Sequence, residues 1–110
     1  MKIDFKLIEE KNFPAFKGGN KSLDAKMFFD GKCRIMRGRL EAGASIGMHT
    51  HETNCEILMI IKGRGKAICE GTEEILEPGD VSFCEKGQTH TLINESKECL
   101  EFFAVVPELN

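Results

Sequence analysis

The sequence predicts an all-β protein, either a sandwich or a barrel. Short apolar runs, broken by turns that contain glycine, recur along most of the chain. No window keeps apolar residues at the i, i+3, i+4 and i+7 positions of an amphipathic helix between capping signals. A chain of 110 residues is long enough for one core and too short for a second. We therefore expect a single domain over residues 1–110.

The strands are expected in the following order. Residues 1–22 include "IDFKLI", which alternates like a strand, and we expect an N-terminal extension or edge strand there that a partner subunit could exchange. Residues 25–29 and 32–40 flank Asp30-Gly31, a strong hairpin signal. Further strands are expected within residues 56–63, 64–71, 73–80, 80–87, 90–96 and 99–107.

The run "KCRIMRGRL" also predicts which side chains face the core. Met36, Gly38 and Leu40 alternate with Arg37 and Arg39, so one set lies inside and the other outside. Charged side chains rarely enter a barrel unpaired, and we expect the two arginines on the outer face. If they pointed inward, an anionic substrate would follow.

The same parity predicts the interior of the other strands. Leu58 and Ile60 would follow Glu56 inward, Leu92 would follow His90, and Phe102 or Phe103 would point in from the last strand. The interior beyond these polar residues is therefore expected to be apolar.

Composition excludes several classes of partner. The formal net charge is -3 and the basic residues are scattered, which disfavours nucleic acid and anionic membranes as partners. No window approaches the roughly 18 apolar residues of a membrane span. The N-terminus is charged at close intervals and has no apolar signal-peptide core, so we expect a cytoplasmic protein.

The cysteines favour reduced thiols over a disulfide framework. Their number is odd, their spacing is wide, and no CxxC pair occurs. Most are expected to be small buried residues. Cys55 adjoins Glu56, and we expect it to point outward beside the site.

The histidines carry the strongest functional signal. On a strand, His49 and His51 would share one face, and a tight turn would return the carboxylate of Glu56 beside them. His90 begins another strand, so none of the three histidines is left over. Incidental surface histidines are the alternative, but every one occupies a ligand-compatible position. Three imidazoles and one carboxylate suit a divalent transition metal such as Mn, Fe, Ni or Zn, with Co and Cu also compatible.

At this point the sequence resembles the cupin family. The first cupin motif reads G(X)5HXH(X)3–4E(X)6G, and five residues match it at every spacing: Gly43, His49, His51, Glu56 and Gly63. The second motif reads G(X)5PXG(X)2H(X)3N. It is matched at four residues, Gly79, Gly87, His90 and Asn94, with Glu85 where proline is usual. The two motifs cover residues 43–94.

The resemblance implies a double-stranded β-helix, or jelly-roll, barrel of antiparallel strands with a metal inside. It implies that His49, His51, Glu56 and His90 are the metal ligands. It also implies a homodimer, in which the N-terminal strand could be exchanged. The substitution at Glu85 affects one turn and leaves the ligand set complete.

Cupins differ widely in chemistry, so the fold leaves the function open. The first hypothesis is a metalloenzyme acting on a small bidentate oxygen-containing molecule, by dioxygenase-like or other Lewis-acid chemistry. The alternative is a non-catalytic module that binds or senses a small ligand, and storage is disfavoured because the ligand set would be idle.

The chain has no tyrosine and no spare histidine, which disfavours an isomerase that needs a His/Tyr acid–base pair. No catalytic residue is assigned. Gln88 and Asn94 could bond to imidazoles or water, although turn and strand-end roles are more common.

Overall fold

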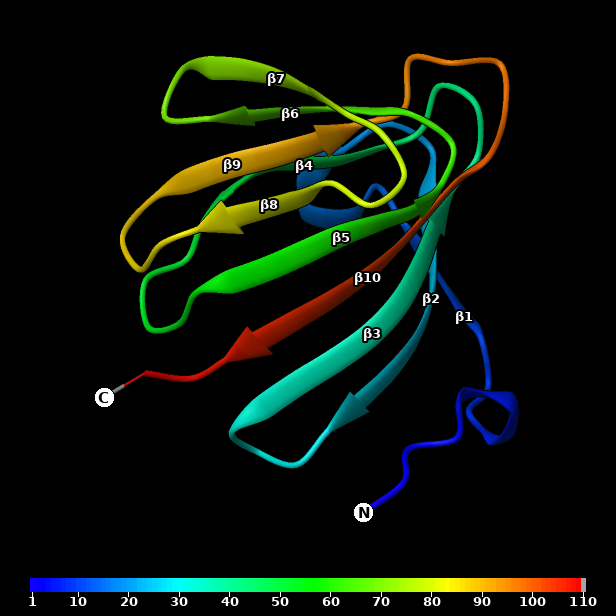
Figure 1. Ribbon diagram of the computed structural model, residues 1–110, viewed down its shortest axis with the longest axis vertical. Coiled ribbons are helices and arrows are strands. Elements are labelled where there is room, and N and C mark those ends of the chain that lie inside the picture. The colour runs from blue at the N-terminus through cyan, green and yellow to red at the C-terminus, as the bar shows by residue number, and fades with distance from the viewer. Residues whose placement is uncertain (110) are drawn as a thin grey trace.

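The computed structural model describes residues 1–109, and over these residues the strands form two antiparallel sheets (Figure 1). The six-stranded sheet has the order β1-β2-β3-β10-β5-β8. Its strands are β1 (Lys11–Pro14), β2 (Ser22–Phe29), β3 (Cys33–Leu40), β10 (Leu100–Pro107), β5 (Glu56–Lys62) and β8 (Val81–Cys84). The four-stranded sheet has the order β4-β9-β6-β7. It consists of β4 (Ser45–Thr50), β9 (Thr89–Ile93), β6 (Gly65–Cys69) and β7 (Thr72–Leu76). The all-β prediction is confirmed, and the arrangement is that of a jelly roll.

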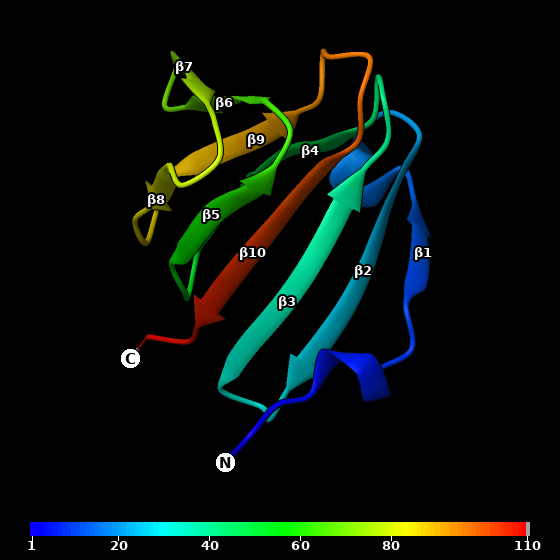
Figure 2. The same ribbon diagram turned by 45° about the vertical axis from the view of Figure 1, so that its right-hand side comes forward.

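The two sheets face each other and enclose the core, as the turned view shows (Figure 2). Side chains alternate across each strand, so the inward set forms one apolar cluster. Met36, Gly38 and Leu40 are buried, whereas Arg37 and Arg39 are exposed, as expected. The other buried residues include the predicted Leu58, Ile60, Leu92 and Phe102.

Gly38 is needed because its position faces the Phe102 ring. A Cβ atom at Gly38 would overlap the ring carbons of Phe102, which is fully buried. Strand β3 therefore has no side chain at this position, which leaves room for the Phe102 ring. The alternation in "MRGRL" reflects this close packing.

The prediction for the N-terminal residues is wrong in detail. The segment "IDFKLI" forms a single 3-10 turn, η1 (Phe5–Leu7), rather than a strand. The side chain of Asp4 accepts a hydrogen bond from the Lys6 backbone at 3.0 Å, which favours a turn over an extended chain. An edge strand does form within residues 1–22, but it is β1, and it pairs with β2 of the same chain.

Residues 15–20 form a strap that crosses to the second sheet. The strap contains the turn η2 (Phe16–Gly18), and the non-glycine residues Ala15 and Lys17 adopt left-handed φ angles of 48° and 54°. Asn20 bonds Ser45 of β4 twice, through Ser45 N–H to the Asn20 carbonyl at 3.0 Å and Asn20 N–H to Ser45 Oγ at 2.9 Å. The strap is therefore fixed against the start of the strand that carries His49.

Gly47 allows this close approach, since a Cβ atom there would overlap the backbone carbonyl oxygen of Lys17. We predict that Gly47→Ala destabilises the protein by about 3 kcal/mol, because two backbones cannot relieve the overlap by changing a rotamer. Gly71→Ala is the control. Gly71 has φ of 80° but open space around it, so only a conformational cost of about 1 kcal/mol is expected. Urea unfolding measures both, and equal losses would contradict the packing role of Gly47.

Candidate metal centre

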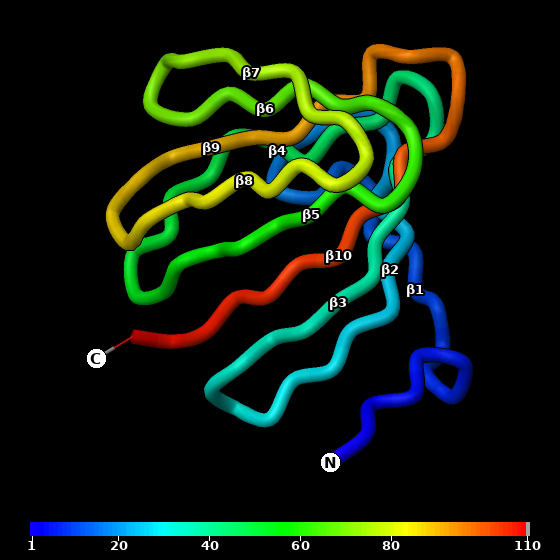
Figure 3. The backbone as a smooth tube through the Cα atoms, in the orientation of Figure 1, coloured from blue at the N-terminus to red at the C-terminus, as the bar shows by residue number. Residues whose placement is uncertain are grey.

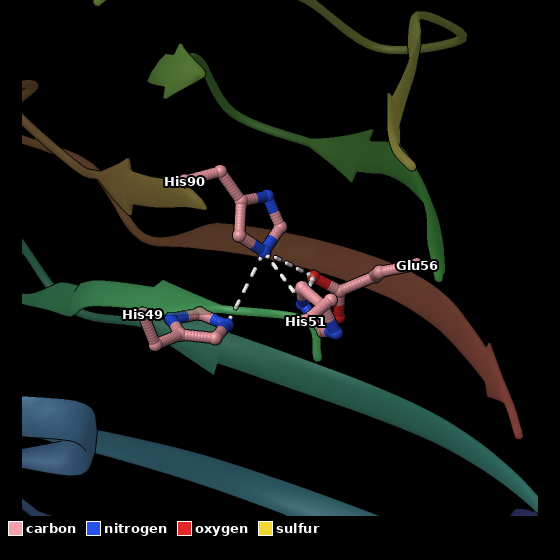
Figure 4. Close-up of side chains that lie close together, drawn as sticks. All are labelled: His49, His51, Glu56 and His90. Carbon is pink, nitrogen blue, oxygen red and sulfur yellow. Dashed lines mark hydrogen bonds and ion pairs between the residues drawn. The ribbon is translucent and has the colours of Figure 1, made fainter. Parts of the chain in front are cut away.

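Three strands and one loop bring the four predicted residues together. His49 lies near the end of β4, and its register partner on β9 is His90. His51 follows β4 directly, and Glu56 begins β5. The β4–β9 ladder shifts register between Ile46 and His49, a bulge of the kind that re-aims side chains. Figure 4 shows the four side chains pointing at one another, as the sequence predicts.

The tips of the four side chains converge on one point. The Nε2 atom of His90 lies 2.9 Å from Nε2 of His51 and 3.2 Å from Nε2 of His49. The Glu56 carboxylate oxygen Oε1 lies 2.9 Å from Nε2 of His90 and 3.5 Å from Nε2 of His51. His51, Glu56 and His90 are buried, and His49 is half-buried. The donor atoms are thus close together and largely shielded from water.

Outer hydrogen bonds set the orientation of two imidazoles. His49 Nδ1 lies 2.7 Å from the Gly47 carbonyl, which can only accept. His51 Nδ1 lies 2.5 Å from Asn54 Oδ1, and the amide nitrogen of Asn54 donates to Glu108 at 2.6 Å. Each Nδ1 therefore carries a hydrogen, and Nε2 is the nitrogen of each ring that faces the centre.

Glu56 supplies the negative charge of the cluster. Burial alone would raise the pKa of the Glu56 carboxyl, but hydrogen bonds from His51 and His90 outweigh it and lower that pKa to about 2. Burial lowers the pKa of His49, while the hydrogen bond to Glu56 raises the pKa of His51. Loss of the Nε2 protons that bond Glu56 would leave an ionised carboxylate beside imidazole lone pairs, which is a set of donors for a cation.

The geometry fits a single metal ion. With metal–ligand bonds of about 2.1 Å, neighbouring ligands lie about 3.0 Å apart at right angles and about 3.4 Å apart in a tetrahedron. The separations of 2.9, 3.2, 2.9 and 3.5 Å lie within about 0.1 Å of this range, and all four ligand atoms lie within 4.8 Å of one another. The four residues form a cluster that could hold a metal ion. The nitrogen-rich donor set suits a transition metal better than calcium or magnesium.

A cavity of about 460 Å³ lies over the cluster. Its wall is partly apolar, formed by Phe13, Phe16, Met27, Met36 and Val106. Polar and charged residues complete it: Lys17, Arg34, Thr50, Glu52, Thr53 and Asn54, together with His49, His51 and Glu56. A small molecule in this cavity would therefore reach the cluster.

Two cationic residues of this cavity are absent from the predicted site. Arg34 lies two residues before Met36, so the alternation that places Met36 inside also places Arg34 on the inner face. That signal was present in the sequence. Lys17 enters from the strap, and no sequence pattern indicates its position.

Other sequence expectations have mixed outcomes. Cys55 was expected to point outward, and this is wrong, because Cys55 is buried where its N–H bonds the Pro107 carbonyl at 3.4 Å. Gln88 and Asn94 serve turns and strand ends. The Gln88 side chain accepts from the Glu85 N–H at 2.9 Å, and the Asn94 amide donates to backbone carbonyls, including that of Leu40 at 2.9 Å.

Comparison with known proteins identifies the family. Residues 36–106 match the family model described as the cupin domain. The chain is a cupin. None of the helices within residues 1–109 of this cupin is long and apolar enough to cross a membrane.

One similar protein is an oxalate-binding protein of Thermotoga maritima, which is 37% identical over 76 residues. The match covers 68% of this cupin and 63% of that relative, so the cupin spans less than two thirds of the relative's length. A crystal structure from the same organism, described as a predicted oxalate decarboxylase, has a TM-score of 0.91 at 29% identity. That match covers 99% of this cupin and 100% of the other chain.

More distant structures share the fold alone. A sugar phosphate isomerase from Silicibacter pomeroyi has a TM-score of 0.80 at 20% identity, over 98% of this cupin and 76% of the other chain. The cupin domain of Cnp3 from Schizosaccharomyces pombe has a TM-score of 0.79 at 13% identity, over 98% and 74%. The same barrel thus carries different functions.

Cys84 lies opposite Glu56 in the β5–β8 ladder and is buried. Burial, and then the neighbouring Cys69, raise the pKa of the Cys84 thiol to about 12. We predict that iodoacetamide at pH 8 alkylates Cys84 at least about a hundredfold more slowly than an ordinary exposed thiol, because the side chain is buried and its raised pKa leaves little of the reactive thiolate. Mass spectrometry of the digested protein measures the extent at each cysteine, with urea-unfolded protein as the control. Labelling of Cys84 as fast in the folded as in the unfolded protein would contradict the prediction.

Proposed function

We propose that His49, His51, Glu56 and His90 bind a divalent transition metal, which binds a small bidentate oxygen-containing molecule. The convergence of three imidazole nitrogens and one carboxylate oxygen beneath a cavity of about 460 Å³ carries this proposal. The bound metal would act as a Lewis acid that polarises the oxygens of the molecule. The sequence and the donor set allow Mn, Fe, Ni or Zn.

The protein's own residues would orient and shield the ligand. The Gly47 carbonyl and Asn54 hold His49 and His51 in their orientations, and Glu108 in turn fixes the Asn54 amide. The apolar part of the cavity wall excludes water from one side of the ligand. A low-dielectric wall strengthens the attraction between the ion and an anionic ligand.

The proposed ligand class is a small carboxylate that presents two oxygens to the metal, such as oxalate. The oxalate-binding relative from Thermotoga maritima supports this class. Metal-dependent binding is the step that a sensor and an enzyme would share, and it is the function we assign. The cytoplasm stays the proposed location, in agreement with five free cysteines.

Turnover is a second candidate function, favoured by Glu52. This carboxylate lines the same cavity and lies outside the four-residue cluster, so it is available as a general acid or base. Incubation of metal-loaded protein with oxalate, followed by chromatography of the products, tests this function. Recovery of all the oxalate would argue for binding alone.

The two carboxylates of the cavity give a matched test of the metal site. We expect about one metal ion per chain in the purified protein and little or none in Glu56→Gln, because the amide removes the anionic ligand. Glu52→Gln should retain the metal, since Glu52 lies at the rim and is exposed. Elemental analysis after dialysis against a weak chelator measures all three proteins. Equal metal content in the two variants, or none in the wild type, would refute the proposed site.

We also propose a homodimer formed through the outer face of the six-stranded sheet. Five apolar residues of β5 and β8 are 38–56% exposed on this face: Ile57, Met59, Ile61, Val81 and Phe83. Ile57 is the register partner of Phe83, and Met59 that of Val81, so the residues form one patch. A second copy of the same patch would cover it across a two-fold axis. Because β1 pairs within its own chain, this interface needs no exchange of strands.

Charge placed in this patch should separate the subunits. We expect Phe83→Lys to convert the dimer to a monomer, because a lysine would be buried unpaired at the interface. Ile75→Lys is the control, since Ile75 is also exposed but lies on β7 of the other sheet. Sedimentation velocity measures the masses. A monomeric wild type, or the same shift in both variants, would contradict the proposed interface.

A further inference from the structure

The cavity over the metal cluster is lined by two cations that form no ion pair with its carboxylates, Glu52 and Glu56. Arg34 and Lys17 both line it, and neither has a carboxylate oxygen within 4.0 Å among residues 1–109. Arg39, on the outer face of the same strand as Arg34, pairs with Glu10 at 2.8 Å. Arg34, on the inner face of β3, thus lacks the carboxylate partner that Arg39 has on the outer face.

Arg34 is held in place by contacts that leave its guanidinium without a carboxylate hydrogen bond among residues 1–109. Its guanidinium carbon lies 4.4 Å from the centroid of the Phe29 ring, and its Nη1 atom donates to the Met27 sulfur at 3.6 Å. An aromatic face and a thioether position the group but are weak partners for a cation. The nearby Glu108 carboxylate already accepts from Thr53 and Asn54, at 2.8 and 2.6 Å. A half-buried guanidinium with free donors is a site for an anion.

Lys17 reaches the same cavity from the strap. Its backbone is fixed in the left-handed region by the close approach to Gly47, and its ammonium group lies 5.6 Å from the centroid of the Phe16 ring. A flexible ammonium adds positive charge without the fixed fork of an arginine. Arg34 is therefore the better placed of the two to select a carboxylate by shape.

The cavity is larger than oxalate requires. A volume of about 460 Å³ compares with about 30 Å³ for each molecule of liquid water, so there is room for roughly fifteen waters. Oxalate has only six non-hydrogen atoms. The apolar side chains of Phe13, Met27 and Val106 border the remaining space, which suits a short hydrocarbon chain.

We infer that the ligand is a 2-hydroxy or 2-oxo acid with a second carboxylate, whose head chelates the metal while Arg34 binds the distal carboxylate. Lys17 adds to the attraction. This inference rests on the proposed metal-dependent binding and narrows its ligand class. Arg34 is a specificity residue that distinguishes dicarboxylates from monocarboxylates with the same chelating head.

Matched pairs of acids test this role. In the first pair, malate and 2-hydroxybutanoate share a metal-chelating head. 2-Hydroxybutanoate has a methyl group where malate has its distal carboxylate. In the second pair, 2-hydroxyglutarate and 2-hydroxypentanoate are one carbon longer. Calorimetric titration of manganese-loaded protein gives a Kd for each acid. We expect the diacid of one pair to bind at least about tenfold more tightly than its monoacid, as a charge-assisted hydrogen bond provides. The pair with the larger ratio shows which of the two chain lengths better spans the gap between the metal and Arg34.

Variants of β3 locate the effect. Arg34→Gln should weaken binding of the diacid by about 10- to 100-fold and change binding of the monoacid by less than threefold. Arg37→Gln is the matched control, because Arg37 is exposed on the outer face of the same strand. It should bind both acids as the wild type does. Lys17→Gln should weaken diacid binding by a smaller factor, and thermal unfolding of each variant shows that the fold is kept.

The outcomes separate this inference from the proposed function. A protein that takes up no metal overturns the proposed function, and with it this inference. A metal-loaded protein that binds oxalate or a monoacid, but gains nothing from the distal carboxylate in either pair, overturns this inference alone. The same holds if Arg34→Gln weakens diacid and monoacid equally, since Arg34 would then only support the fold of the cavity.

Discussion

Two backbone hydrogen bonds join the β4–β5 loop to the β8–β9 turn, and the site depends on them. The His51 N–H bonds the Gln88 carbonyl at 3.0 Å, and the Gly87 N–H bonds the His51 carbonyl at 2.6 Å. The two segments are distant in sequence and lie together at one end of the barrel (Figure 3). His51 follows the last residue of β4, so without these bonds the strand ladder alone would not fix it. The pairing of His49 with His90 and this second tie together aim three imidazoles at one point.

The cluster illustrates how a small barrel tolerates buried polar groups. A buried carboxylate and three imidazoles would be costly in an apolar core unless their hydrogen-bonding groups were satisfied. Within residues 1–109, every buried side-chain nitrogen and oxygen has a partner. Glu56 satisfies two of the three imidazoles, because its oxygen Oε1 contacts both His51 and His90. The barrel therefore brings together a donor set that could hold a cation, and a preformed set reduces the reorganisation that binding requires.

Much of the fold and the cluster could be predicted because both follow from periodicity. Alternation along β3 and β5 placed Met36 and Leu58 inside, and the spacing of the first motif placed His49 and His51 on one face. The same alternation places Arg34 inside, two residues before Met36, but a charged side chain there conflicts with the expectation that charges stay on the outer face.

Other features depend on contacts that no local pattern reveals. The turn at Phe5–Leu7 reflects one hydrogen bond that the Asp4 side chain accepts from the Lys6 backbone, although the apolar residues alternate as in a strand. Cys55 is buried by the end of β10, which is far away in sequence. Lys17 reaches the cavity because its backbone is left-handed. This conformation is typical of glycine, so a lysine in the sequence does not predict it.

The strap has a consequence for how this protein could change over evolutionary time. It carries Lys17 into the cavity, and it packs on Gly47, whose carbonyl orients His49. Yet it lies outside the ladders of the two sheets and outside the segment that matches the cupin family. A substitution of Lys17 would alter the charge and depth of the cavity without touching the strand ladders. Position 17 is thus a place where ligand preference can diverge, because its side chain lies in the cavity and belongs to neither sheet.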